Sequence, residues 1–244
     1  MTLKTAVDEI ADNIFRLSTF FPDVATDGFT VNQFLLRADE PLLFHCGYRH
    51  MFPMLQEAAG RVVKVRTLRW LAFGHTEADE MGAMNQWLAA APDSQAAQGA
   101  VGCNVNVGDL ADRAPRALAD GERVDLGGLR VRWIDTPHVP HGWDAGILFE
   151  ERTSTLLCGD LFTHGGPGPA VREDDVVERA LATDEDTAAA TCLMPGTAPL
   201  IRRLADLEPR TLALMHGSSY EGDCVEALHA LADGYEHRLL SRMP

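Results

Sequence analysis

The stretch GHTEADE, residues 74–80, decides the fold class of this sequence. It follows the run TLRWLAF, residues 67–73, whose apolar and aromatic composition predicts a buried strand, and it precedes a segment with the apolar period of an amphipathic helix. Alternate side chains of an extended segment point to one side, so His75 and Glu77 can face one pocket while Asp79 turns in at the helix start. This geometry suits two metal ions held side by side. The same residues are also compatible with a helix cap at Asp79 in a solvated acidic turn.

Three later segments place further ligand-type side chains at the ends of predicted strands. They are TPHVPHGWDAG (residues 136–146), LCGD (residues 157–160) and LMHG (residues 214–217). Each segment alone is weak evidence for a metal, because a single His or Asp at a strand end is more often a hydrogen-bonded polar group. Four such segments in this order indicate one shared site.

The rest of the chain alternates predicted strands and helices. Apolar, β-branched or aromatic runs between turn residues predict strands, and apolar residues at helical spacing predict helices. The predicted strands are Asn13–Phe20, Phe29–Leu36, Pro41–Phe44, Thr67–Phe73, Ala96–Val101, Arg123–Leu126, Leu129–Ile134, Gly146–Glu150, Thr155–Leu157 and Thr211–Met215. The predicted helices are His50–Val62, Glu80–Ala90, Asp174–Thr191, Ala198–Leu207 and Glu221–Leu240. With neither repeats nor a low-complexity linker, residues 1–244 are expected to form one α/β domain.

Composition and charge exclude several classes of protein. Hydrophobic residues make up 46% of the 244 residues and charged residues 23%, which excludes a disordered or collagen-like chain. The net charge of −15 argues against nucleic acid and anionic membranes as partners, because an acidic surface repels both. The sequence contains no apolar signal core, no run of the ~18 apolar residues that span a bilayer, and no C-x-x-C spacing among its cysteines. A cytoplasmic protein is therefore expected.

The order H-x-E-x-D, then T-P-…-H, then G-D, then H-G resembles the metallo-β-lactamase superfamily, and specifically its di-iron branch of flavodiiron and oxygen-binding di-iron proteins. The resemblance covers nearly all of the chain, including LLFHCG at residues 42–47. It implies a four-layer αββα sandwich in a single domain. Glu77 selects the branch, because hydrolytic members usually carry a histidine there, whereas a carboxylate makes the site harder and better suited to iron.

The resemblance also implies ligands for two adjacent metal ions. His75, Glu77 and His141 would bind one ion, Asp79 and His216 the other, and Asp160 would bridge them. His141 fits the family motif better than His138, because His141-Gly142-Trp143-Asp144-Ala145 matches it and the separation 160 − 141 = 19 resembles the family spacing. The candidate catalytic residues are His138, which could orient a bound ligand by hydrogen bonding, and Tyr220, which could line the pocket.

Two chemistries follow from such a cage of three histidines and three carboxylates. The first is a non-haem di-iron protein that binds or reduces O2, with NO as a further candidate, either as an enzyme or as an oxygen or redox sensor. The second is a dinuclear zinc hydrolase acting on an ester, thioester or phosphodiester through a metal-bound hydroxide. Iron is the expected metal, with zinc or manganese as alternatives.

The resemblance implies partners as well, and the sequence departs from it at one position. No flavodoxin segment with a phosphate-binding loop is recognised, so no FMN is assigned and electrons would come from a separate flavoprotein or a rubredoxin-like donor. Related proteins pair head to tail, which implies a homodimer. Glu80 stands where many flavodiiron proteins and hydrolases have a histidine directly after the Asp, which changes the hydrogen bonding and the proton supply around the metals.

Overall fold

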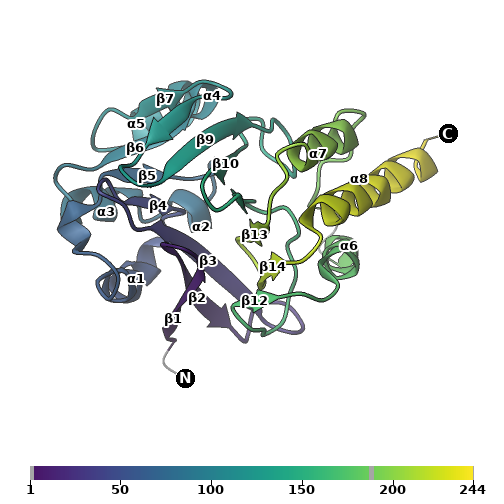
Figure 1. The fold of residues 1–244 in the computed structure, drawn as a ribbon, viewed down its shortest axis with the longest axis horizontal. Coiled ribbons are helices and arrows are strands. Elements are labelled where there is room, and N and C mark those ends of the chain that lie inside the picture. The colour runs from purple at the N-terminus through teal and green to yellow at the C-terminus, as the bar shows by residue number, and fades with distance from the viewer. Residues whose placement is uncertain (1–2, 187–189, 244) are drawn as a thin grey trace.

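Two mixed β-sheets lie face to face between two layers of helices in the computed structural model, which describes residues 3–186 and 190–243 (Figure 1). The first sheet has the order β1 (Thr5–Ala11), β2 (Ile14–Phe21), β3 (Phe29–Leu36), β4 (Leu42–Phe44), β5 (Trp70–Ala72), β6 (Gln95–Gly99) and β7 (Arg116–Leu118). The second has the order β12 (Val171–Arg172), β14 (Ser219–Glu221), β13 (Thr211–Ala213), β11 (Thr155–Leu157), β10 (Gly146–Glu150), β9 (Arg130–Asp135) and β8 (Arg123–Asp125).

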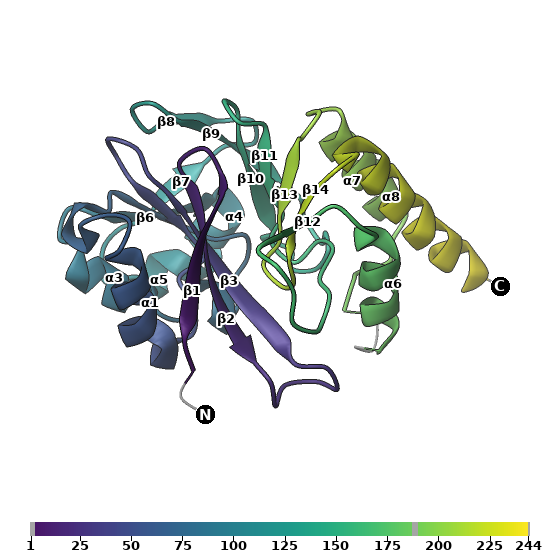
Figure 2. The same cartoon turned by 60° about the horizontal axis from the view of Figure 1, so that its bottom comes forward.

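The helices cover the outer faces of the two sheets, as Figure 2 shows most clearly. On the side of the first sheet lie α1 (Phe52–Ala59), α2 (Ala78–Met81), α3 (Met84–Ala90), α4 (Ala100–Gly102) and α5 (Gly108–Leu110), with the short turns η1 (Arg49–Met51), η2 (Val65–Thr67) and η3 (Cys103–Val107). On the side of the second lie α6 (Val176–Asp186), α7 (Thr197–Ala205) and α8 (Cys224–Ser241). The predicted four-layer αββα sandwich is therefore confirmed.

Alternation along β3 shows why this sequence builds a layered core. Phe34 and Leu36 belong to the cluster between the two sheets, whereas Leu35, one residue away, belongs to the cluster under the helices of the first sheet. Successive strand side chains point to opposite faces, so a stretch that is apolar at consecutive positions, as at the end of β3, is buried on both sides. A third cluster joins the second sheet to α6, α7 and α8. Three apolar interfaces between four layers thus hold the fold.

Two differences from the predicted elements have physical causes. The helix predicted over Glu80–Ala90 is two helices, α2 and α3, because the Ala83 N–H donates to the Gly47 carbonyl at 2.8 Å and leaves the helical ladder. Strand β1 was not predicted, since its acidic residues hide the alternation expected of a strand at the edge of a sheet. Strands β7, β12 and β14 were also not predicted.

The remaining predicted elements agree within a few residues. The end of the helix predicted over Asp174–Thr191 falls on residues 187–189, which lie outside the described residues. The glycine- and proline-rich segment Thr163–Ala170 is a loop. Within the described residues, none of the helices combines the length and the hydropathy that a membrane crossing requires.

Asn32 ties the two sheets together beside the loop that follows β13. Its side chain is fully buried, and its amide nitrogen donates to the carbonyl oxygens of Leu214 and Gly217, each at 2.8 Å. These two carbonyls flank His216 in sequence. Residues 214–217 follow β13 of the second sheet, whereas Asn32 lies on β3 of the first sheet. The amide of Asn32 therefore fixes the position of this loop relative to the first sheet.

We therefore expect Asn32→Ala to lower the free energy of unfolding by about 1–3 kcal/mol, the cost of leaving a buried carbonyl unpaired. Asn85→Ala is the matched control, since Asn85 makes a similar bond to the Leu110 carbonyl at 2.9 Å but in an exposed setting. Chemical denaturation of both variants measures the difference. Equal losses in the two variants would contradict a special role for the buried amide.

Candidate metal centre

The six predicted ligands come together at one end of the sandwich. His75 and Glu77 lie in the link between β5 and α2, and Asp79 lies in the first turn of α2. The other three lie in the links β9–β10, β11–β12 and β13–β14 and are His141, Asp160 and His216. Each follows the end of a strand, so the two sheets deliver residues that are far apart in sequence to one place.

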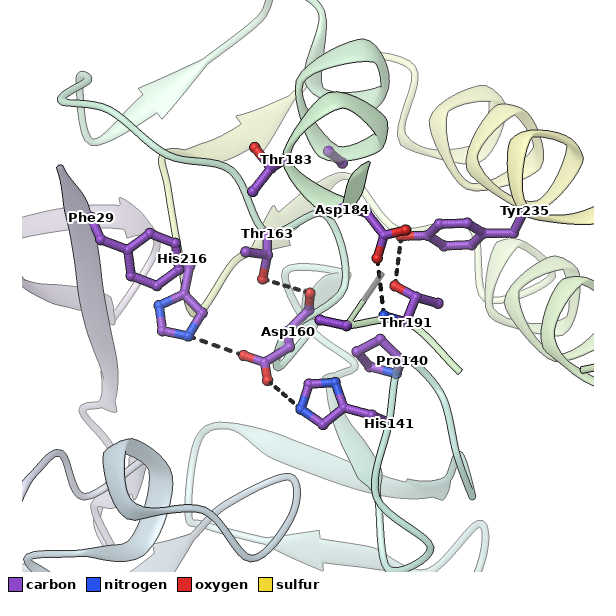
Figure 3. A pocket seen from close by; sticks show the side chains of 12 residues that line it. Phe29, Pro140, His141, Asp160, Thr163, Thr183, Asp184, Thr191, His216 and Tyr235 are labelled. Carbon is purple, nitrogen blue, oxygen red and sulfur yellow. Dashed lines mark hydrogen bonds and ion pairs between the residues drawn. The ribbon is translucent and has the colours of Figure 1, made fainter. Parts of the chain in front are cut away.

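Asp160 occupies the middle of this group, and its two carboxylate oxygens face different histidines. Oδ2 lies 3.2 Å from Nε2 of His141, and Oδ1 lies 3.2 Å from Nε2 of His216 (Figure 3). Asp79 closes the second side, with its Oδ2 atom 3.3 Å from Nε2 of His216. The Asp160 carboxylate thus lies between two sets of donor atoms, one on the side of His141 and one on the side of His216. A carboxylate in this position could bridge two cations.

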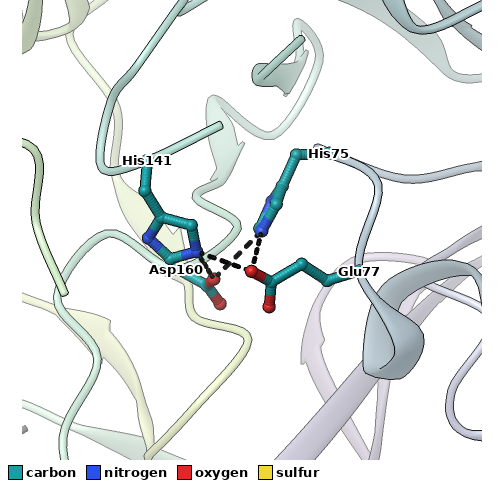
Figure 4. A group of neighbouring side chains, drawn as sticks. All are labelled: His75, Glu77, His141 and Asp160. Atoms are coloured by element: carbon teal, nitrogen blue, oxygen red, sulfur yellow. Dashed lines mark ion pairs between the residues drawn. The ribbon is translucent and has the colours of Figure 1, made fainter. Parts of the chain in front are cut away.

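The first set contains four residues whose ligand atoms all lie within 4.8 Å of one another: His75, Glu77, His141 and Asp160 (Figure 4). Glu77 Oε1 lies 3.3 Å from Nε2 of His141 and 3.5 Å from Nε2 of His75. These contacts are longer than the ~2.7–2.9 Å of a charged hydrogen bond. They match the separation, roughly 3–3.5 Å, of two donors that each lie ~2.1 Å from the same ion.

Unsatisfied buried atoms provide a second test of whether cations fit here. Nε2 of His75 and Oδ1 of Asp160 are buried and have no hydrogen-bond partner within the described parts of the chain. Leaving such atoms unpaired is costly, so groups of this kind are normally satisfied by a partner, by water or by an ion. The free atoms point into the two donor sets. The first donor set therefore fits a metal ion, and Asp160, Asp79 and His216 face one another beside it.

Charges within the group shift the pKa values of its side chains. Hydrogen bonds to Asp160 and Glu77 raise the pKa of His141 to about 9. Burial favours the neutral ring of His216, but the contacts to Asp160 and Asp79 outweigh burial and raise its pKa to about 10. The contact with His141 is the largest of the causes that lower the pKa of Glu77 to about 2. The clustered carboxylates therefore attract positive charge strongly.

Backbone contacts aim His216 at the second donor set. Its Nδ1 atom lies 2.7 Å from the Thr30 carbonyl oxygen, a contact that requires Nδ1 to carry the proton. In a neutral ring, Nε2 then has a free lone pair beside Asp160 with which it could bind a metal ion. The ring of Phe29 packs against the imidazole, with 4.3 Å between the ring centroids. Neighbouring residues at the start of β3 therefore fix both the tautomer and the orientation of this histidine.

A cavity of about 160 Å³ adjoins Asp160, His141 and His216 on the side of the second helical layer (Figure 3). Among its lining residues are the apolar or aromatic side chains of Phe29, Pro140, Ala180 and Tyr235. A space of this size holds a few molecules as small as water. The donor sets therefore open onto a small, largely apolar space.

Buried polar contacts hold the far wall of this cavity in place. Asp184 of α6 accepts from the Thr191 N–H and from Nη1 of Arg238, both at 2.9 Å. The Thr191 hydroxyl donates to the Tyr235 hydroxyl at 3.1 Å. These bonds join α6 and the segment after it to α8. The residues that form this wall are therefore held in fixed positions relative to one another.

The two candidate catalytic residues lie elsewhere. His138 is exposed, and its backbone N–H donates to the Gly142 carbonyl at 2.7 Å. Tyr220 is on β14 and lines a separate, open surface depression with Glu173 and Pro209. Neither residue is among those that line the cavity at Asp160. Their roles stay predictions.

Two further residues lie close to the six predicted ligands, and of these only Glu80 was placed beside the metals from the sequence. Tyr48 follows β4, and burial together with the charges of Asp79, Glu77 and Asp160 raises the pKa of its phenol. The strand-end rule that located the ligands applies equally to this position. Glu80 is fully buried, and its carboxylate lies 3.1 Å from Nδ1 of His75. The sequence placed Glu80 beside the metals but did not show which side chain it contacts.

Comparison with known proteins gives one consistent result. No family model matches the chain. The sequence is 26% identical over 203 residues to diflavin flavoprotein A 1 of Nostoc sp. strain PCC 7120, covering 78% of this chain and 34% of that protein. The chain therefore spans about a third of the length of this curated relative.

Solved structures match over nearly the whole chain. A fragment, residues 1–254, of diflavin flavoprotein A 5 from Nostoc sp. PCC 7120 has a TM-score of 0.84 at 18% identity, and 99% of each chain is covered. Rubredoxin oxygen:oxidoreductase of Desulfovibrio gigas gives 0.80 at 15% identity, covering 98% of this chain and 63% of that one. The metal-soaked Flv1 flavodiiron core of Synechocystis sp. PCC6803 gives 0.78 at 20% identity, covering 98% and 62%.

The fold is that of the flavodiiron core. The resemblance inferred from the sequence motifs is thus confirmed, and it extends over both sheets and both helical layers. At these identities the solved structures establish the architecture. What the centre binds must be argued from its own donor atoms.

The raised histidine pKa values predict how the stability of the metal-free flavodiiron-like fold depends on pH. A histidine whose pKa is raised by folding stabilises the fold while it is protonated in the folded state. That contribution is present below the ordinary pKa of 6.5 and is lost as the pH rises through about 9 for His141 and about 10 for His216. The free energy of unfolding of the metal-free protein should therefore fall with pH across this window.

Denaturant titrations at a series of pH values measure this slope. His141→Gln is the control, because it lacks the titrating ring and should show a shallower slope. Apparent metal affinity should change in the opposite direction and rise with pH, since the metal displaces protons from the same nitrogens. A slope that is identical in the two proteins would contradict the assignment.

Proposed function

We propose that this chain is a non-haem di-iron protein that binds or reduces O2, with NO as a further candidate substrate. His75, Glu77 and His141 bind one iron, Asp79 and His216 bind the other, and Asp160 bridges them. The observation that carries the proposal is the position of Glu77. Its carboxylate lies 3.3 Å from Nε2 of His141, among the donors of the first ion.

The chemistry of the donor set supports iron over zinc. The first set joins two imidazoles to the carboxylates of Glu77 and Asp160, a harder and more anionic environment than the histidine-rich first site of hydrolases. Two adjacent ferrous ions supply electrons and open coordination positions for a diatomic molecule.

The protein residues around the centre fit a small substrate. The cavity at Asp160, with Phe29 and Pro140 in its wall, has room for a few diatomic molecules and offers little polar surface to a larger, charged one. Phe29 also covers one face of the His216 ring and so excludes water from that side. The Desulfovibrio gigas protein with the same fold is named rubredoxin oxygen:oxidoreductase, which favours oxygen reduction over hydrolysis.

We also propose that residues 1–244 act as one di-metal unit and that electrons reach it from a donor outside these residues, such as a flavoprotein or a rubredoxin-like protein. Half of the Glu77 side chain is accessible to solvent, 48%, so the first donor set has a face near the surface. We further propose a cytoplasmic homodimer, by analogy with the paired relatives. Without a donor, the reduced centre would bind oxygen or react once, as a sensor or scavenger does.

Anaerobic loading with ferrous ion, followed by metal analysis and optical spectra on addition of O2, tests the proposed function. We expect two irons per chain and an absorption band that depends on oxygen, with oxygen consumption when a chemical reductant and a flavoprotein are supplied. A panel of model esters and phosphodiesters is assayed in parallel. Zinc as the only tightly held metal, together with hydrolytic turnover that Asp79→Ala abolishes, would overturn the proposal in favour of a hydrolase.

Glu77→His should shift the metal preference of the centre toward zinc, because it replaces the hard oxygen donor of the first ion with a third imidazole. The measurement is the iron-to-zinc ratio bound in competition from an equimolar mixture. Glu57→His serves as the control, since Glu57 is exposed and pairs only with Arg61 at 3.0 Å within the described residues. An unchanged ratio in Glu77→His would show that Glu77 does not determine the choice of metal.

A further inference from the structure

The carboxylate of Glu80 is enclosed between two histidines immediately behind the first donor set. Oε1 lies 3.1 Å from Nδ1 of His75, and Oε2 accepts from the His75 backbone N–H at 2.8 Å. On its other side, Oε2 lies 3.4 Å from Nδ1 of His45. Glu80 and His45 are both fully buried. A charged group is rarely removed from water in this way unless it is paired.

Glu80 is placed to act through His75 and not as a ligand itself. It is absent from the four residues whose ligand atoms converge, although it directly follows Asp79 in sequence. Adjacent positions on a helix point in different directions, about 100° apart, so Asp79 faces His216 while Glu80 faces the interior. Its Oε2 atom accepts from the His75 backbone N–H, and its Oε1 atom faces Nδ1 of His75 as an ion-pair contact at 3.1 Å.

Local backbone geometry keeps this position open for a carboxylate. A Cβ atom at Gly74 would lie 3.2 and 3.3 Å from the two Glu80 oxygens and 2.9 Å from the Gly146 carbonyl oxygen. The Glu80 carbonyl in turn accepts from the Cys46 N–H at 2.5 Å, which ties the start of α2 to the turn after β4. The missing side chain at Gly74 leaves room for the Glu80 carboxylate, and the turn after β4 holds the Glu80 backbone in place.

The contact determines which nitrogen of His75 is free. Because Nδ1 faces the carboxylate at 3.1 Å, it carries the proton, and Nε2 is left as the lone-pair donor that points at Glu77 and Asp160. Nε2 is also one of the buried atoms without a hydrogen-bond partner in the described chain. A carboxylate behind a metal-binding imidazole fixes the tautomer and the ring orientation and makes the nitrogen a stronger ligand.

Charge gives a second consequence. The three carboxylates of the donor sets, with neutral histidines, carry −3 against +4 for two divalent ions. Glu80 adds one more negative charge, so the four carboxylates together would balance the charge of two divalent ions. A buried carboxylate next to the ions stabilises their higher oxidation states relative to their lower ones.

We propose that Glu80 is a positioning residue that orients His75 as an Nε2 ligand and, as the fourth carboxylate, sets the affinity and the reduction potential of the adjacent metal ion. A histidine at this position, as in many relatives, would supply neither the acceptor for Nδ1–H nor the negative charge. His45 holds the carboxylate from behind. The proposal rests on the proposed function only in requiring that the centre binds two metal ions.

Titration of metal-free protein with Co²⁺ and with Zn²⁺ compares the wild type with Glu80→Gln, which keeps the shape and removes the charge. We expect the wild type to bind two ions and the variant to bind one of them ~10–100-fold more weakly, with the other unchanged. In iron-loaded protein the variant should show a more positive reduction potential, which a purely structural role for Glu80 would not produce.

Glu150→Gln is the matched control. Glu150 is also a fully buried carboxylate, but it accepts from the backbone N–H and hydroxyl of Thr153 in the turn after β10. Its loss should lower stability and leave both metal affinities and the potential unchanged. Two ions bound by Glu80→Gln with wild-type affinity and potential would overturn the proposal and leave the proposed function intact. A wild type that binds no metal would overturn both.

A measurement on the wild type keeps the proposal testable if Glu80→Gln does not fold. In zinc-loaded protein, nitrogen-15 NMR distinguishes a metal-bound imidazole nitrogen from a protonated one, and His75→Gln assigns the signals. We expect Nε2 of His75 to bind the metal and Nδ1 to keep a slowly exchanging proton. A metal bound through Nδ1, or an Nδ1 without a proton, would contradict the role assigned to Glu80.

Discussion

The carboxylate of Asp160 is the constraint on which the rest of the centre depends. Its two oxygens face His141 and His216 at equal distances of 3.2 Å, so one side chain must serve two donor sets at once. This works only if the loops after β9, β11 and β13 are held at fixed heights relative to one another. The carboxylate oxygens of this group lie close together and repel one another. This repulsion costs free energy when no cation is present, and the same oxygens attract cations.

The sandwich meets this requirement by joining its sheets close to the site. Asn32, from the first sheet, donates to the carbonyls on either side of His216, and the Arg16 guanidinium donates to the Gly217 carbonyl at 3.0 Å. His216 itself donates to Thr30. These bonds hold His216, which follows a strand of the second sheet, in place against β2 and β3 of the first sheet. His75 follows β5 of the same first sheet. The position of His216 relative to His75 is therefore set by bonds that join the two sheets.

The sequence was informative where chemistry and strand ends coincide. The segments that carry the six predicted ligands were singled out because each follows an apolar run that predicts a buried strand, and the resemblance to the di-iron family then selected the six residues within them. Tertiary contacts decided what could not be read from the sequence: Ala83 leaves the helical ladder for the Gly47 carbonyl, and β1 pairs at the sheet edge despite Asp8 and Glu9. Residues drawn in by folding, such as Phe29 over His216, carry no local signal of their role.

Asp79 and Glu80 show what the fold adds to the motif. The sequence separated a ligand candidate, Asp79, from a neighbour expected to affect hydrogen bonding around the metals, Glu80, but gave neither residue its contacts. The helix that starts at Ala78 points them in different directions, so that Asp79 faces His216 and Glu80 is buried against His75 and His45. A carboxylate can remain charged in that interior only because two imidazoles enclose it. Glu80 is therefore enclosed directly behind His75, and it adds a negative charge beside the first donor set.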